Sequence, residues 1–92
     1  MSESANINEV RLYLAAEFPD ARIEVIKEET GDISFAVEAA ATTYLLTMVT
    51  EYGESRSAAQ VAEELPSFCV ADTMRSLGEF RVLLTPSGCI FA

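Results

Sequence analysis

The stretch ARIEVIKEETGDISFAVEA, residues 21–39, decides the fold of this chain. Its side chains alternate through Ala21–Glu28 and again through Asp32–Ala39, which predicts two β-strands. The residues between them, 29–31, fit a three-residue hairpin loop with Gly31 at the left-handed position. We therefore predict an antiparallel hairpin whose loop length fixes the register of its two strands.

That register divides the hairpin into two faces. Val25 faces Phe35 and Ile23 faces Val37, so the large apolar side chains share one side of the sheet. The other side receives four opposed pairs: Arg22 and Glu38, Glu24 and Ala36, Ile26 and Ser34, Glu28 and Asp32. A two-residue loop would scatter charges over both sides, so the turn chemistry and the hydrophobic pattern agree.

Further elements are predicted on both sides of the hairpin. Asn6–Phe18 reads as a helix, with Asn6 as its N-cap in a capping box and Pro19 ending it. Thr42–Tyr52 is rich in threonine, aromatic and branched residues and predicts a third strand. Its side chains 44, 46 and 48 point to the core, unless it is a central strand covered on both faces.

The second half of the chain predicts two short helices and two strands. Ser57 and Gln60 form a capping box after a polar loop and open a helix that Pro66 stops. Another helix starts at Ser67 and ends at Gly78. Strands over Glu79–Thr85 and Cys89–Ala92 follow, joined by a Pro-Ser-Gly turn.

The order α-β-β-β-α-α-β-β predicts an α+β fold in a single domain, residues 1–92. We expect a two-layer sandwich in which the helices cover one face of a mostly antiparallel sheet. The opposite face of the sheet is then free.

Charge is the strongest indication of function. Fifteen acidic side chains oppose six Lys or Arg and no histidine, for a net charge of -9. Such a field repels nucleic acids and anionic membranes and attracts basic surfaces. The cations are scattered singly rather than in a stripe: Arg11, Arg22, Lys27, Arg56, Arg75 and Arg81. We expect a basic protein partner, no direct nucleic-acid binding and no membrane contact.

The inventory of reactive residues argues against an enzyme. There is no nucleophile elbow and no glycine-rich phosphate loop, so we expect no catalysis and no cofactor. The acids around Gly31 lack the 12-residue calcium-loop pattern, so we expect no metal. Cys69 and Cys89 stand in apolar surroundings and are predicted to be buried free thiols. Without a long apolar run or a signal peptide, a cytoplasmic location is expected.

The candidate binding residues are acids of the outer sheet face and the loop after the third strand: Glu24, Glu28, Asp32, Glu38, Glu51 and Glu54. Same-side residues of a strand lie about 7 Å apart, which is comparable to the phosphate spacing of one nucleic-acid strand. These acids could therefore imitate phosphates, with Ile26, Leu45 and Val49 adding apolar contact. The alternative is an acidic coat that only aids solubility.

Small size, acidity, the lack of catalytic residues and the α+β plan together resemble the small acidic anti-CRISPR proteins. The resemblance implies a phage-encoded inhibitor that acts in the bacterial host cell. Such an inhibitor occupies the DNA-binding surface of a Cas subunit in a type I surveillance complex.

Two alternatives stay open. An antitoxin-like interaction module would mask a basic partner through an apolar sheet face. The chain is expected to be a monomer, but a free sheet edge at Cys89–Ala92 could form a weak homodimer by strand addition.

Overall fold

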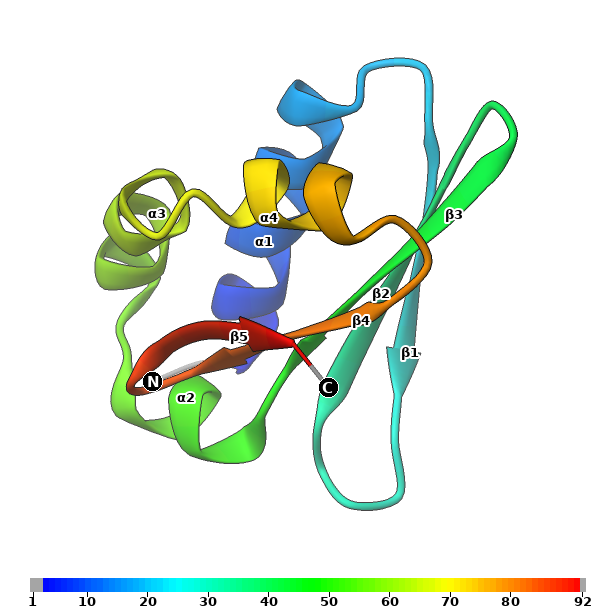
Figure 1. Cartoon of the computed structure of the whole chain (residues 1–92). Helices are drawn as coiled ribbons and strands as arrows, with labels where there is room; N and C mark the ends of the chain where they lie inside the picture. The colour runs from blue at the N-terminus through cyan, green and yellow to red at the C-terminus, as the bar shows by residue number, and fades with distance from the viewer. Residues whose placement is uncertain (1–2, 92) are drawn as a thin grey trace.

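The computed structural model describes residues 3–91, and in this range one sheet packs against helices on one of its faces (Figure 1). The α+β class and the order of elements are confirmed, with one additional short helix, α2. The elements are α1 Glu3–Glu17, β1 Arg22–Lys27, β2 Ile33–Ala39, β3 Thr42–Met48, α2 Thr50–Ser55, α3 Ala58–Ser67, α4 Val70–Leu77, β4 Arg81–Thr85 and β5 Gly88–Phe91.

The hairpin of β1 and β2 has the predicted register. Val25 pairs with Phe35 and Ile23 with Val37, as predicted. The outward pairs in the register are Arg22 with Glu38, Glu24 with Ala36, and Ile26 with Ser34. The Glu28 N–H donates to the Asp32 carbonyl at 2.9 Å, which closes the three-residue loop. Gly31 has φ +95°, a conformation that side-chain-bearing residues rarely adopt.

The strands lie in the order β1-β2-β3-β4-β5. Each neighbouring pair is antiparallel except β3 and β4, which run parallel. A parallel pair needs a long crossover, and α2, α3 and α4 supply it. This connection places β4, and with it the β4–β5 hairpin, at the end of the sheet opposite to β1.

The core lies between the sheet and the helices. Phe35, Leu46 and Leu84 from the sheet are fully buried against Leu14 of α1 and Met74 of α4. Leu46 and Met48 of β3 face this core, as predicted, and Tyr44 packs at its margin. Alternate residues of each strand therefore point to the side of the sheet that no helix covers.

The sequence-based boundaries were wrong at the start of the chain. Helix α1 begins at Glu3, and Asn6 is not its N-cap but a fully buried residue inside it. The Asn6 amide donates to the carbonyls of Gly53 and Arg56, both at 2.9 Å. Asn6 thus satisfies carbonyls near the end of α2, a demand that only the tertiary structure reveals.

Three further expectations need correction. Strand β3 ends at Met48, and residues from Thr50 form helix α2 instead of continuing the strand. Pro66 lies inside α3, which ends one residue later because the Phe68 N–H still reaches the Glu64 carbonyl at 2.8 Å. Cys69 is exposed rather than buried, since it forms the left-handed link between α3 and α4 with φ +54°.

Cys89 is half-buried and packs at the margin of the core, where burial raises the pKa of its thiol. The capping box of Ser57 and Gln60 is present at the start of α3. Gly78 ends α4 with φ +63°, as predicted. The last strand starts at Gly88, and the part of its predicted range at Ala92 lies outside the described residues.

Candidate functional site

The candidate site is the side of the sheet that faces away from the helices, which we call the open face. The strand registers arrange its side chains in rows across the sheet. The rows are Arg22, Glu38 and Thr43; Glu24, Ala36, Leu45 and Arg81; and Ile26, Ser34, Thr47, Leu83 and Ile90.

The centre of the open face is small and polar. Ser34 and Thr47 are each 3% exposed, and their hydroxyl oxygens lie 2.9 Å apart in a hydrogen bond. Ser34 also donates to the carboxylate of Glu28. The centre of the open face is therefore buried, and its exposed side chains lie nearer the edges and ends of the sheet.

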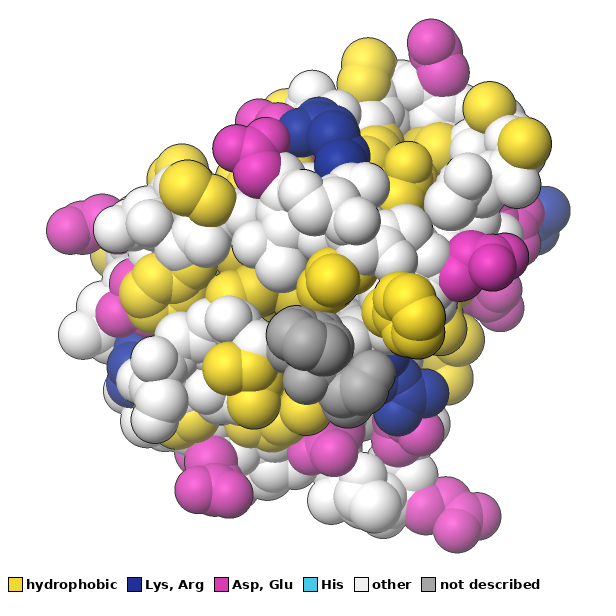
Figure 2. Space-filling model, in the orientation of Figure 1, with side chains coloured by type: hydrophobic (Ala, Val, Ile, Leu, Met, Phe, Trp, Pro, Cys, Tyr) yellow, Lys and Arg dark blue, Asp and Glu magenta, His cyan; other side chains and the backbone are white. Residues whose placement is uncertain are grey.

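The longest row begins and ends with an exposed apolar side chain. In the longest row, Ile26 on β1 is 41% exposed and Ile90 on β5 is 50% exposed, while Leu83 between them is half-buried. Leu45 is half-buried in the adjoining row. Figure 2 shows one side of the molecule, on which hydrophobic and acidic side chains are both exposed. On the open face, the exposed Ile26 and Ile90 lie at opposite edges of the sheet, and the polar centre lies between them.

Glu24 and Glu38 are the free carboxylates of this face. Both are exposed, and neither makes a hydrogen bond or an ion pair with another residue of the described range. Arg22 lies opposite Glu38 in the predicted register, but no ion pair joins the two side chains. Glu24 and Glu38 are diagonal neighbours across β1 and β2, a relation that places their Cα atoms about 7–8 Å apart.

Glu28 and Asp32 have structural partners instead. One carboxylate oxygen of Asp32 accepts hydrogen bonds from the N–H of Thr50 at 2.8 Å and from its hydroxyl at 2.9 Å. The bond from the Thr50 N–H, with those from neighbouring hydroxyls, keeps the pKa of Asp32 below its usual value. Val49, the N-cap of α2, cannot cap the helix with its own side chain, so Asp32 takes that role from the hairpin.

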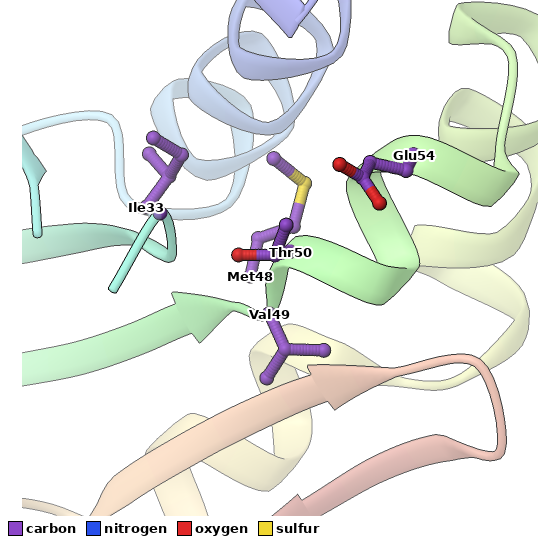
Figure 3. Close-up of a pocket in the computed structure, with 7 residues that line it drawn as sticks. Ile33, Met48, Val49, Thr50 and Glu54 are labelled. Atoms are coloured by element: carbon purple, nitrogen blue, oxygen red, sulfur yellow. The ribbon is translucent and has the colours of Figure 1, made fainter. Parts of the chain in front are cut away.

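Glu51 and Glu54 lie apart from the open face, on α2. Both are exposed, and Glu54 borders a cavity of about 310 Å³ between α2 and the ends of β2 and β3. Figure 3 shows Glu54, Met48 and Thr50 around this space, with Ile33 across it and Val49 pointing away toward β4. The Thr50 hydroxyl is already hydrogen-bonded to Asp32, so Glu54 is the one carboxylate that lines the cavity, beside the apolar side chains of Ile33 and Met48. The residues that line this cavity therefore do not include a pair that could act as acid and base.

The six predicted acids therefore do not form one regularly spaced row. Glu24 and Glu28 are separated by Ile26 on the same face, a distance of about 13 Å at 3.3 Å per residue. Only Glu24 and Glu38 approach the spacing of consecutive phosphates. Sequence reasoning also missed Leu83, Ile90 and Arg81, because nothing local indicated that β4 lies beside β3. The alternation of residues 81–84 was the available sign that Leu83 shares a face with Arg81.

Comparison with known proteins found no matching family model, no matching curated protein and no matching solved structure. No helix within residues 3–91 is both long and apolar enough to cross a membrane. The described residues contain no group of three or more His, Cys, Asp or Glu side chains placed to hold a metal ion.

Proposed function

We propose that this protein binds a basic protein surface through its open face and thereby blocks whatever that surface otherwise binds. One observation carries the proposal: the uncovered side of the sheet combines exposed apolar side chains with two carboxylates that have no partner in the described structure.

The two parts of the face would contribute differently. Ile26 and Ile90 would supply contact area that releases water on binding. Glu24 and Glu38 would pair with arginine or lysine of the partner. Charged pairs of this kind favour a partner of the right sign and speed its approach. The net charge of -9 acts in the same direction over a longer range.

The anti-CRISPR resemblance suggests which basic surface to test first. A groove that binds DNA presents regularly spaced cations, and the diagonal pair Glu24 and Glu38 has a matching separation. We therefore propose the DNA-binding surface of a type I surveillance complex as the target. The proposed role needs neither a cofactor nor catalysis.

The antitoxin-like alternative has its own supporting observation, the exposed apolar side chains of Ile26 and Ile90. A partner held mainly by these side chains would bind with little dependence on salt. A partner held through Glu24 and Glu38 would be released as salt screens the charges, since the Debye length falls from about 30 Å at 0.01 M to about 3 Å at 1 M.

The experiment immobilises the protein and measures capture of a purified type I complex at low and at high salt, with and without target DNA duplex as competitor. The proposal predicts capture at low salt that both high salt and the duplex abolish. Capture that persists at high salt would favour the antitoxin-like masking role. Capture that the duplex leaves unchanged, or no capture at any salt, would contradict this target.

A further inference from the structure

The two edges of the sheet differ in charge. Strand β1, at one edge, exposes Arg22, Glu24 and Lys27. Strand β5, at the other edge, has the sequence GCIF and carries no charge. Charged side chains on an edge strand hinder pairing with another chain, because pairing would bury or oppose them. The β1 edge is protected in this way, and the β5 edge is not.

The hydrogen bonds of β4 show which groups of β5 are free. The Leu84 carbonyl accepts from the Val49 N–H at 3.2 Å, so the polar groups of Leu84 point toward β3. Because these directions alternate along a strand, Leu83 and Thr85 point toward β5 and bond with their register partners, Ile90 and Gly88. The N–H and C=O groups of Cys89 and Phe91 therefore point out of the sheet edge.

We propose that a second copy of this chain pairs with β5 in antiparallel fashion, with a two-fold axis beside Ile90. In this register Cys89 of each copy lies opposite Phe91 of the other, and each such pair exchanges two N–H···O bonds. Ile90 lies opposite Ile90 of the second copy as a non-hydrogen-bonded pair. The Cα atoms of such a pair are about 4.5 Å apart, close enough for the two side chains to touch.

A second copy of the chain fits the β5 edge, although two chains of net charge -9 repel each other. Their repulsion is smallest where neither copy presents carboxylates. Strand β5 meets that condition, and Arg81 is the charged side chain of the adjacent strand β4. A two-fold axis also requires a surface that complements itself, and Ile90, 50% exposed, buries its free area against its own copy.

The dimer would have one continuous sheet with the two open faces side by side. The Ile90 side chains of the two copies would meet at the two-fold axis. The pair Glu24 and Glu38 of each copy would lie toward the outer end of its half of the sheet. This inference does not depend on the proposed binding of a basic partner, because it concerns the protein by itself.

The test is the mass of the protein in solution by sedimentation velocity, over micromolar to millimolar concentrations and at low and high salt. We expect a dimer whose share grows with concentration and with salt, since salt screens the repulsion. Binding of a basic partner would respond to salt in the opposite direction. A monomer throughout both ranges would overturn the proposal.

A matched pair of variants locates the interface. Ile90→Lys places two like charges opposite each other on the two-fold axis, and we expect it to weaken dimerisation at least tenfold. Ile26→Lys makes the same chemical change at a similarly exposed position of the same face, on the other edge strand, and should leave the dimer intact. A dimer that survives Ile90→Lys, or that Ile26→Lys disrupts equally, would overturn the β5 interface.

A cross-link tests the register without adding charge. In a background with Cys69→Ser and Cys89→Ser, Ile90→Cys places two thiols on residues about 4.5 Å apart, within the Cα range of disulfides. We expect a covalent dimer under mild oxidation. Ile26→Cys in the same background should stay monomeric. Failure of the first variant to cross-link, or equal cross-linking of both, would overturn the proposed register.

Discussion

Single polar side chains connect the helices to the sheet and to each other over long stretches of chain. Asn6 donates to carbonyls at the C-terminal end of α2, Asp32 caps α2 from the hairpin, and the Tyr52 hydroxyl donates to Glu64 of α3 at 2.9 Å. None of these roles could be predicted from the sequence, because each partner lies 12 or more residues away. Asp32 looked like a surface charge for the same reason, since its partner Thr50 lies 18 residues away.

The capping role of Asp32 makes a first prediction. Asp32→Ala removes the acceptor at the start of α2 and should lower the free energy of unfolding by about 1 kcal/mol. Asp32→Asn keeps an acceptor and should cost less. Chemical denaturation measures both, and an unchanged stability in Asp32→Ala would contradict the capping role.

The same carboxylate makes stability depend on pH. Its pKa is lower in the folded chain than the value of about 3.9 in an unfolded one. Its contribution is therefore complete above about pH 4 and is lost as the pH falls through the folded pKa. Denaturation curves between pH 2 and 6 should show a smaller loss in Asp32→Ala than in the wild type.

Tyr52 makes a further prediction, in the alkaline range. Its side chain is fully buried, and burial together with the Glu64 hydrogen bond raises the pKa of its hydroxyl. The folded pKa thus exceeds the unfolded value of about 10, so stability falls as the pH rises above about 10. Tyr52→Phe should cost about 1 kcal/mol at pH 7 and should flatten the alkaline decline. An equally steep decline in Tyr52→Phe would contradict this assignment.

Individual elements divide into those with local determinants and those without. The register of the β1–β2 hairpin was predicted to the residue, and its strand ends to within one residue, because its loop, alternation and turn glycine all lie within residues 21–39. Helix α2 was missed because its cap comes from Asp32, and β3 appeared to continue through it. The position of β4 beside β3 was not predictable, since it depends on how three helices return the chain across the sheet.

The candidate site was likewise predictable only where neighbouring residues in the sequence determine it. The outward positions of Glu24, Ile26 and Glu38 followed from the hairpin alone. The contribution of Leu83 and Ile90 to the same face required the strand order. The removal of Asp32 from the free acids required a contact between the hairpin and α2.

The hairpin loop makes a prediction at the scale of elements. Gly31 has φ +95°, and a Cβ added there would lie 3.0 Å from the Thr50 hydroxyl oxygen, whereas a Cβ on Gly53, inside α2, would meet only side-chain atoms of Met48 at 3.5 Å or more. A positive φ costs a side-chain-bearing residue about 1–2 kcal/mol, whereas alanine is favoured over glycine inside a helix by about 1 kcal/mol. Gly31→Ala should therefore be more destabilising than Gly53→Ala, because it adds both strain and a close contact. Thermal unfolding of the two variants measures this, and the reverse order would contradict the packing of the loop against α2.

At the scale of the whole molecule, charge and architecture act together. All the helices of residues 3–91 lie on one side of the sheet, so the opposite side has no helix over it. We propose that the net charge of -9 favours basic partners and that Ile26 and Ile90 give such a partner apolar area to bury. In this proposal the open face is the surface that recognises them.

The most direct measurement is a two-dimensional NMR titration of the isotope-labelled protein with a short peptide of alternating lysine and leucine. A peptide with glutamate in place of lysine serves as the control. We expect shift changes concentrated at Glu24, Ala36, Glu38 and Leu45, lost in the double variant Glu24→Lys and Glu38→Lys and retained in Glu51→Lys and Glu54→Lys. Changes centred on α2, or equal loss in both double variants, would contradict the account.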